Sequence, residues 1–191
     1  MKNKFRKLSK ISLTLIYLVI VAGAIVRMTG SGMGCPDWPK CFGYYIPPTE
    51  SKQLLFKANN YYEKGMMILL EHQEFLVAKK DFTSTDSFDA NDWKVYSKHN
   101  YVTYDPIHTW VEYVNRLIGV LSGIPILIFS ILSFWFWKKN KWIPIVSILT
   151  LFGMGCQAWL GKTVVDSNLT PHKITIHMVV ALLIVAFILY L

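Results

Sequence analysis

Four long apolar runs constrain the fold of this chain more than any other feature of its sequence. The runs lie approximately at Ile11–Met28, Val111–Trp137, Trp142–Leu160 and Ile174–Leu191. A bilayer's hydrocarbon core is roughly 30 Å thick, which takes about 20 helical residues to cross. Because backbone polar groups find no partners in lipid, each run must form a helix. The sequence therefore predicts an all-α integral membrane protein, a bundle of four transmembrane helices in a single membrane domain.

The composition agrees, since 53% of the residues are hydrophobic, only 17% are charged and the mean hydropathy is +0.34. We place the helices at about 11–28, 108–137, 142–161 and 173–191, joined by a long outer loop over 29–106. The alternating segments that are typical of a membrane β-barrel are absent from the sequence.

Basic residues predict the orientation of the helices. They precede the first helix and fill the turn between the second and third, at Lys2, Lys4, Arg6, Lys7, Lys10, Lys138, Lys139 and Lys141. Positive residues in short loops stay on the cytoplasmic side. We expect a cytoplasmic N-terminus and a periplasmic long loop in a bacterial inner membrane. These residues also explain much of the net charge of +8, so no nucleic-acid partner is expected.

The long loop divides into two segments of different composition. Residues 51–80 mix apolar side chains with Lys and Glu, which indicates an amphipathic helix lying on the bilayer or capping the bundle. Residues 81–92 are polar and rich in Ser, Thr and Asp, which is typical of a linker.

Two of the three cysteines, Cys35 and Cys41, lie in the segment Thr29–Gly43, which is dense in Gly, Pro and Trp. An outward loop is an oxidising environment, so the pair can form a structural disulfide. A redox-active pair is the alternative interpretation. We favour the structural bridge.

The second apolar helix opens with a polar stripe of His108, Glu112, Asn115 and Arg116, which share one face at helical spacing. Ionisable groups near lipid are costly, so this face should point to the bundle interior and a partner. An ordinary i,i+4 pair of Glu112 with Arg116 would explain the charges, but not the added His108 and Asn115.

The fourth helix places His177 about one turn inside its apolar run. A Ser or Thr hydroxyl could satisfy a neutral imidazole there. The second and fourth helices both run inward from the outer face, so His108 and His177 are expected at comparable depth. Such a pair suits two axial haem ligands, or one ligand and one catalytic group.

Three motifs resemble those of the haem A synthase family, membrane proteins that assist cytochrome oxidase assembly. The first reads Gly23-Ala-Ile-Val-Arg-Met-Thr-Gly-Ser-Gly-Met-Gly-Cys-Pro-Asp-Trp-Pro-Lys-Cys41. The second, Glu112-Tyr-Val-Asn-Arg116, is similar to the family's Glu-x-x-His-Arg motif. The third is Leu160-Gly-Lys-Thr-Val-Val-Asp-Ser-Asn-Leu-Thr-Pro171, followed by His177. The resemblance runs from about residue 11 to the end of the chain.

This resemblance implies an enzyme that oxidises one methyl group of haem O to a formyl group, giving haem A. Family members consist of two similar four-helix halves, the N-terminal one holding substrate haem and the C-terminal one a haem b. The family's loop cysteines correspond to Cys35 and Cys41, its helix-four histidine to His177 and its helix-two carboxylate to Glu112.

The chain departs from the family pattern in two respects. The family's helix-two histidine falls on Asn115, a poor iron ligand, so we expect either His177 alone or His108 with it to hold the iron, and we prefer the second. The chain also ends at Leu191, within an apolar run and without a second half. The sequence is then either a piece of a longer protein or a half-size protein, and we expect a second four-helix half, another copy of the chain or haem O synthase as partner, besides membrane lipid and haem O.

The predicted site has His177 and His108 on the iron, with Glu112 and Arg116 as catalytic groups at the macrocycle edge. Arg27, at the outer end of the first helix, is a candidate for a haem propionate. Two other functions remain open: a quinone-linked thiol oxidoreductase that uses Cys35 and Cys41, and a haem-binding assembly subunit without catalytic activity.

Overall fold

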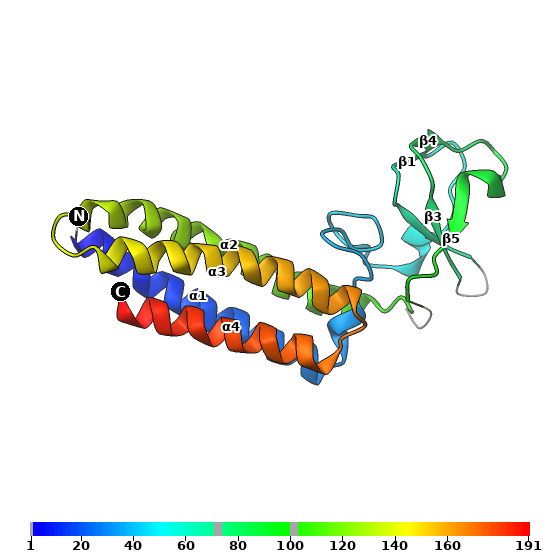
Figure 1. The fold of residues 1–191 in the computed structure, drawn as a ribbon. Helices are drawn as coiled ribbons and strands as arrows, with labels where there is room; N and C mark the ends of the chain where they lie inside the picture. Colours follow the sequence, from blue (N-terminus) through cyan, green and yellow to red (C-terminus); the bar gives the residue numbers. More distant parts are fainter. Residues whose placement is uncertain (1, 71–73, 100–102) are drawn as a thin grey trace. The chain divides into compact units, whose positions relative to one another are not determined.

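The computed structural model describes residues 2–70, 74–99 and 103–191. Within these residues four helices are long and apolar enough to cross a membrane, which confirms the predicted four spans. They are α1 (Lys2–Met28), α2 (Pro106–Ser133), α3 (Trp142–Asp166) and α4 (Pro171–Tyr190), and a short 3-10 turn, η4 (Phe134–Phe136), extends α2 (Figure 1). The described part of α1 includes the basic segment that precedes the apolar run.

The chain forms two compact units. The first, here the bundle unit, contains α1 and the chain from Val114 to Leu191. The second, here the loop unit, runs from Thr29 to Tyr113 and includes the first two turns of α2.

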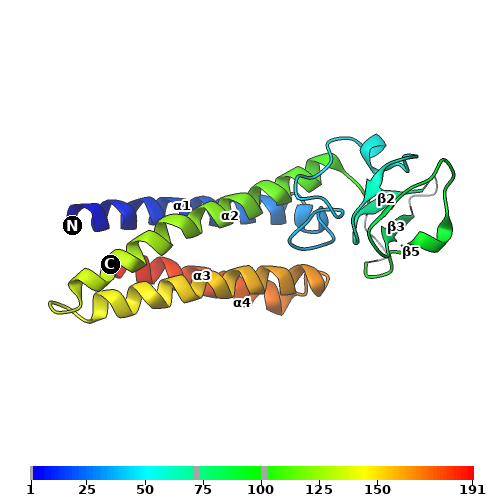
Figure 2. The same ribbon diagram turned by 90° about the horizontal axis from the view of Figure 1, so that it is seen from above.

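The bundle unit consists of helices that lie side by side, α3 and α1 each packing along α4 (Figures 1 and 2). Its core is apolar and lies between the helices, at Phe5, Ile16, Ile126, Phe129, Ile184, Val185 and Ile188. The hydroxyl of Ser130 on α2 donates to the carbonyl of Ser147 on α3 at 3.0 Å. Most other apolar side chains on these helices point outward, as lipid-facing residues must.

The loop unit contains two small antiparallel sheets. One has the order β2 (Met67–Leu69), β3 (Phe75–Ala78) and β5 (Trp93–Val95), with Ile68 opposite Leu76 and Leu76 opposite Val95. The other pairs β1 (Tyr61–Tyr62) with β4 (Phe82–Thr83). Short 3-10 turns lie at η1 (Ser31–Met33), η2 (Ser51–Leu54) and η3 (Ala90–Asp92).

The amphipathic helix that we predicted over 51–80 is therefore wrong for the described part of that range, while residues 71–73 lie outside the described residues. The apolar residues of this segment do not lie on one helical stripe. All four residues of β3 are buried, and they contribute to two cores, in which Val77 packs with Phe42 and Leu76 packs with Tyr62. Among the described residues, Glu63, Lys64, Glu74, Lys79 and Lys80 are exposed and lie between these short strands.

Candidate functional site

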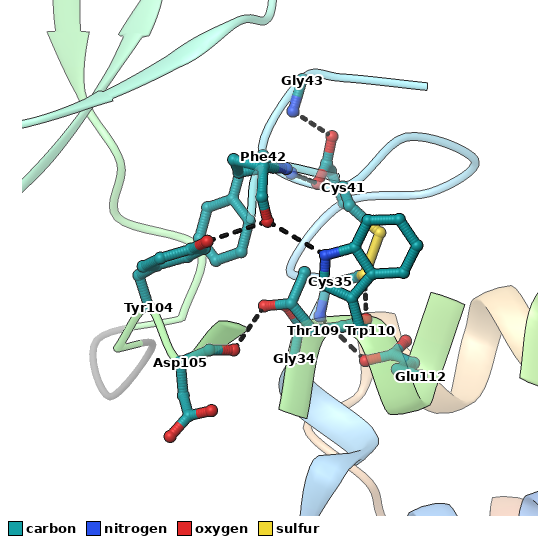
Figure 3. The surroundings of a disulfide bond; sticks show 12 residues. Gly34, Cys35, Cys41, Phe42, Gly43, Tyr104, Asp105, Thr109, Trp110 and Glu112 are labelled. Atoms are coloured by element: carbon teal, nitrogen blue, oxygen red, sulfur yellow. Dashed lines mark hydrogen bonds between the residues drawn. A yellow bond between two sulfur atoms is a disulfide. The ribbon is translucent and has the colours of Figure 1, made fainter. Parts of the chain in front are cut away.

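The disulfide predicted between Cys35 and Cys41 is present (Figure 3). Both cysteines are buried, with exposed fractions of 0% and 1%. A thiol–disulfide exchange requires an attacking thiolate to reach a sulfur atom. The buried position therefore supports a structural bridge and does not favour the thiol oxidoreductase.

The first turns of α2 hold this disulfide loop in place (Figure 3). The Thr109 hydroxyl donates to the Gly34 carbonyl at 2.9 Å, and the Cys35 N–H donates to Glu112 Oε2 at 2.8 Å. Gly34 packs so closely against α2 that a Cβ atom there would overlap the His108 carbonyl and lie 2.8 Å from the Thr109 nitrogen. Glu112 is 4% exposed, so its carboxylate satisfies a donor that water does not reach.

A second carboxylate, that of Asp37, holds the turn that follows Cys41. Asp37 accepts the N–H groups of Phe42 at 2.6 Å and Gly43 at 2.8 Å. Both of these residues have positive φ, 54° for Phe42 and 82° for Gly43, which turns their N–H groups toward one acceptor. A Cβ atom on Gly43 would overlap Met66, so the disulfide loop is also packed directly against the strand region.

The helix α2 starts at a defined cap. Asp105 Oδ1 accepts the backbone N–H groups of Ile107 at 2.8 Å and His108 at 3.0 Å. These two bonds hold the pKa of Asp105 below its usual value, and the bond from His108 has the larger effect. The cap fixes where the helix begins, and it thereby fixes His108, Thr109 and Glu112 along the helix.

His177 lies on α4 in the bundle unit and is half-buried. Its Nδ1 is buried and has no hydrogen-bond partner within the described part of the chain. Gly161 on α3 faces the ring, and a Cβ atom there would lie 3.7 Å from His177 Cε1. Gln157 on α3 donates to the His177 carbonyl at 2.9 Å, which fixes the backbone that carries the imidazole. No Ser or Thr hydroxyl satisfies Nδ1 among the described residues, so the ordinary explanation for this histidine does not apply.

Two further candidates lie in the bundle unit. Arg27 Nη1 is 3.5 Å from the sulfur of Met178, the neighbour of His177 on α4. A thioether is a weak acceptor, so this contact leaves the guanidinium suited to an anion. Asn115 Oδ1 is buried without a hydrogen-bond partner in the described chain, and a Cβ atom on Gly23 of α1 would lie 3.8 Å from it.

The candidate residues are divided between the two units. Arg27, Asn115, Arg116 and His177 belong to the bundle unit, whereas Cys35, Cys41, His108 and Glu112 belong to the loop unit. Their roles stay predictions, as does the comparable depth of His108 and His177. His108 and Asn115 are seven residues apart on the continuous helix α2, about 10 Å along its axis and on nearly the same face.

Sequence reasoning missed the residues that support the loop. Thr109 is fully buried, Gly34 contacts the backbone of α2 and Asp37 orders the turn that follows the disulfide. Asp37 did carry a signal, because a short carboxylate beside prolines is a common partner of turn N–H groups. Nothing in the local sequence shows that Thr109 and Gly34 meet across 75 positions.

These features define a class: membrane proteins of at least four helices whose first two helices are joined by a disulfide-closed loop that is bonded to the second. Comparison with known proteins makes this class specific. The chain matches the model of the cytochrome oxidase assembly protein family, COX15-CtaA, over residues 6–79 and 64–191, and it belongs to this family.

Several relatives of the chain are named heme A synthase. Those of Shewanella oneidensis and Bartonella bacilliformis are each 25% identical, over 90% and 94% of this chain and 39% and 45% of their own lengths. That of Flavobacterium psychrophilum is 26% identical over 92% of this chain and 46% of its own length. The chain thus spans less than half the length of these relatives. No solved structure matches it.

Proposed function

We propose that this chain takes part in haem A synthesis for cytochrome c oxidase assembly, by oxidising a methyl group of haem O to a formyl group. The observation that carries the proposal is the match to relatives named heme A synthase over about nine-tenths of the chain. The proposed setting is a bacterial inner membrane, with the N-terminus in the cytoplasm and the loop unit in the periplasm.

The proposed reaction replaces two C–H bonds by C–O bonds in two hydroxylations. The second hydroxylation gives a geminal diol, which loses one water molecule to leave the aldehyde. With dioxygen as the oxidant the overall change is R–CH3 + O2 → R–CHO + H2O, which balances atoms and electrons. The protein must therefore hold the macrocycle so that one methyl group is at the reacting position, and it must handle protons at that edge.

His177 is the residue that we propose as a ligand of the substrate iron. A ligand histidine must present a ring nitrogen that no protein group occupies. The imidazole of His177 has an unpartnered buried nitrogen within the described chain, and the small residue Gly161 leaves room at its edge. Arg27, beside the neighbouring Met178, is the proposed partner of a propionate.

His108 is the proposed second ligand, in place of the family histidine that Asn115 replaces here. The Asp105 cap and the packing of Gly34 both fix the backbone at His108, which suits a ligand that must be held in position. Glu112 and Arg116 are proposed at the macrocycle edge. Because Glu112 accepts the Cys35 N–H, a change of its protonation would also act on the disulfide loop.

The test is extracted-haem analysis after expressing the chain with a haem O synthase in a bacterium that cannot make haem A. His177→Ala should abolish haem A and reduce the bound haem of the purified protein. His172→Ala is the matched control, because His172 lies on the same helix but is exposed, and this variant should retain both. Haem bound without any haem A would contradict catalysis by this chain and indicate a carrier; unchanged haem binding in His177→Ala would refute the ligand.

The second ligand needs its own variant set. His108→Ala should lose most of the bound haem, and adding Asn115→His should restore part of it, since the two positions share one face of α2. A His108→Ala protein with the optical spectrum and haem content of the wild type would exclude His108 as a ligand.

A further inference from the structure

We propose that a short apolar tip in the loop unit, Tyr45–Ile46, inserts into the phospholipid headgroup region beside the start of α2. This inference concerns an interaction with lipid and does not depend on the proposed chemistry. It follows from the exposure of the tip, from the way in which the tip is fixed to α2 and from the charges beside it.

The tip exposes two adjacent large apolar side chains to solvent. Tyr45 and Ile46 are adjacent and have exposed fractions of 71% and 69%, and Pro47 and Pro48 follow them. The residues on either side of this tip are anchored: Tyr44 pairs with Cys41 through two backbone hydrogen bonds of 2.8 and 3.0 Å. Two adjacent exposed apolar side chains on a fixed backbone indicate a contact surface.

The fixation is to the membrane helix itself. The Pro48 carbonyl accepts one hydrogen bond from Trp110 Nε1 at 3.3 Å and another from the Tyr104 hydroxyl at 2.8 Å. Trp110 lies in the second turn of α2, which begins at Pro106 and continues as a candidate membrane span. Tryptophan and tyrosine near the end of a membrane helix favour the interface, where an indole can keep one polar contact. The tip is therefore held at the level where α2 enters the bilayer.

The neighbouring charges suit phospholipid. Lys40 Nζ lies 4.7 Å from the centroid of the Tyr45 ring and forms an ion pair of 2.9 Å with Glu63 Oε2. Behind the tip is a hollow of about 610 Å³, lined in part by Ile46, Lys57 and Trp110. An ammonium group on a long apolar stem can remain at the phosphate level while neighbouring apolar side chains lie deeper. The exposed Lys57, which lines the same hollow as Ile46, matches a phospholipid surface, with phosphate outside and glycerol and acyl groups beneath.

Site-directed spin labelling in liposomes tests the proposal. The background is full-length Cys156→Ala, because Cys156 is the cysteine outside the disulfide, and the label is placed at Ile46→Cys or, separately, at Tyr45→Cys. Val95→Cys is the control, since Val95 is 60% exposed but belongs to β5 rather than to the tip. Liposomes of phosphatidylcholine with phosphatidylglycerol supply the lipid. Collision with oxygen, which enters lipid, is compared with collision with a water-soluble nickel chelate.

Labels at both tip positions should show an oxygen-to-nickel collision ratio several-fold above that at Val95 in liposomes. Equal ratios at the tip and at Val95 would overturn the proposal. Spin–spin broadening at the tip that grows as the protein-to-lipid ratio rises would also overturn it, because a second copy of the chain would then be the occupant. Two tip positions are used so that a fold defect in one variant cannot decide the result.

Discussion

Replacing Glu112 by alanine should loosen the disulfide loop by an amount that its contacts allow us to calculate. The variant removes the buried carboxylate oxygen that accepts the Cys35 N–H, a bond of 2.8 Å. A buried polar group left unsatisfied costs about 1–3 kcal/mol. Since about 1.4 kcal/mol changes an equilibrium constant tenfold, local opening of the loop should become about 5- to 150-fold more populated.

The reduction rate of the disulfide measures this opening. Cys35 and Cys41 are buried, so a reductant must wait for the loop to open. The protein is incubated with a phosphine reductant in the Cys156→Ala background, and new thiols are trapped with a maleimide. Glu112→Ala should be reduced about 5- to 150-fold faster than the parent by the same calculation.

Two further variants make this assay specific. Glu112→Gln keeps a side-chain oxygen of the same reach, so its rate should stay close to that of the parent. Glu50→Ala removes an exposed carboxylate of the loop unit and should leave the rate unchanged. If Glu112→Ala is reduced at the parent rate, Glu112 does not hold the loop closed and the reasoning is refuted.

Three other perturbations follow from the same contacts. Gly34→Ala should raise the reduction rate and lower thermal stability, since its Cβ overlaps backbone atoms that no side-chain rotation can move; an unchanged melting curve would contradict the packing. Gly153→Ala should melt at a lower temperature than Gly155→Ala, because a Cβ on Gly153 would lie 3.0 Å from the buried Ile184 side chain whereas Gly155 has open space around it; equal melting temperatures would contradict this packing. The lowered pKa of Asp105 means that its stabilising charge is complete above its usual value of 3.8 and is lost as pH falls through the lower folded-state value. Asp105→Asn should therefore flatten the loss of stability below about pH 4, and an acid limb identical to that of the parent would show that this cap does not govern it.

The helices were predictable because few backbone structures satisfy their own polar groups in lipid. A run of about 20 apolar residues has one way to satisfy its backbone in hydrocarbon, so composition alone decides the secondary structure. Their ends were less predictable. The end of α3 at Asp166, six residues beyond the predicted run, depends on local hydrogen bonding, where apolar content carries no information.

The strands of the loop unit could not be predicted in the same way. Segments such as Met67–Leu69 and Phe75–Ala78 are too short to show a period of two, and mixed apolar and charged residues fit a helix equally well. What decides the structure is burial on both sides of β3 by residues that are distant in the chain, such as Phe42 and Trp93. The disulfide was foreseen from loop composition, but Thr109 was not, because its importance arises from a partner 75 positions away.

The disulfide loop is completed in two stages: its cysteines pair first, and contact with α2 follows. Its cysteines are six positions apart, so in the proposed periplasmic location they can pair as soon as that segment leaves the translocation machinery. Thr109 and Glu112, which bond to the loop from α2, are synthesised 68 and 71 residues after Cys41. An oxidase therefore has access to the thiols only in the interval before α2 arrives. After α2 docks, the same bond is shielded, and the order of synthesis makes its formation easy and its loss slow.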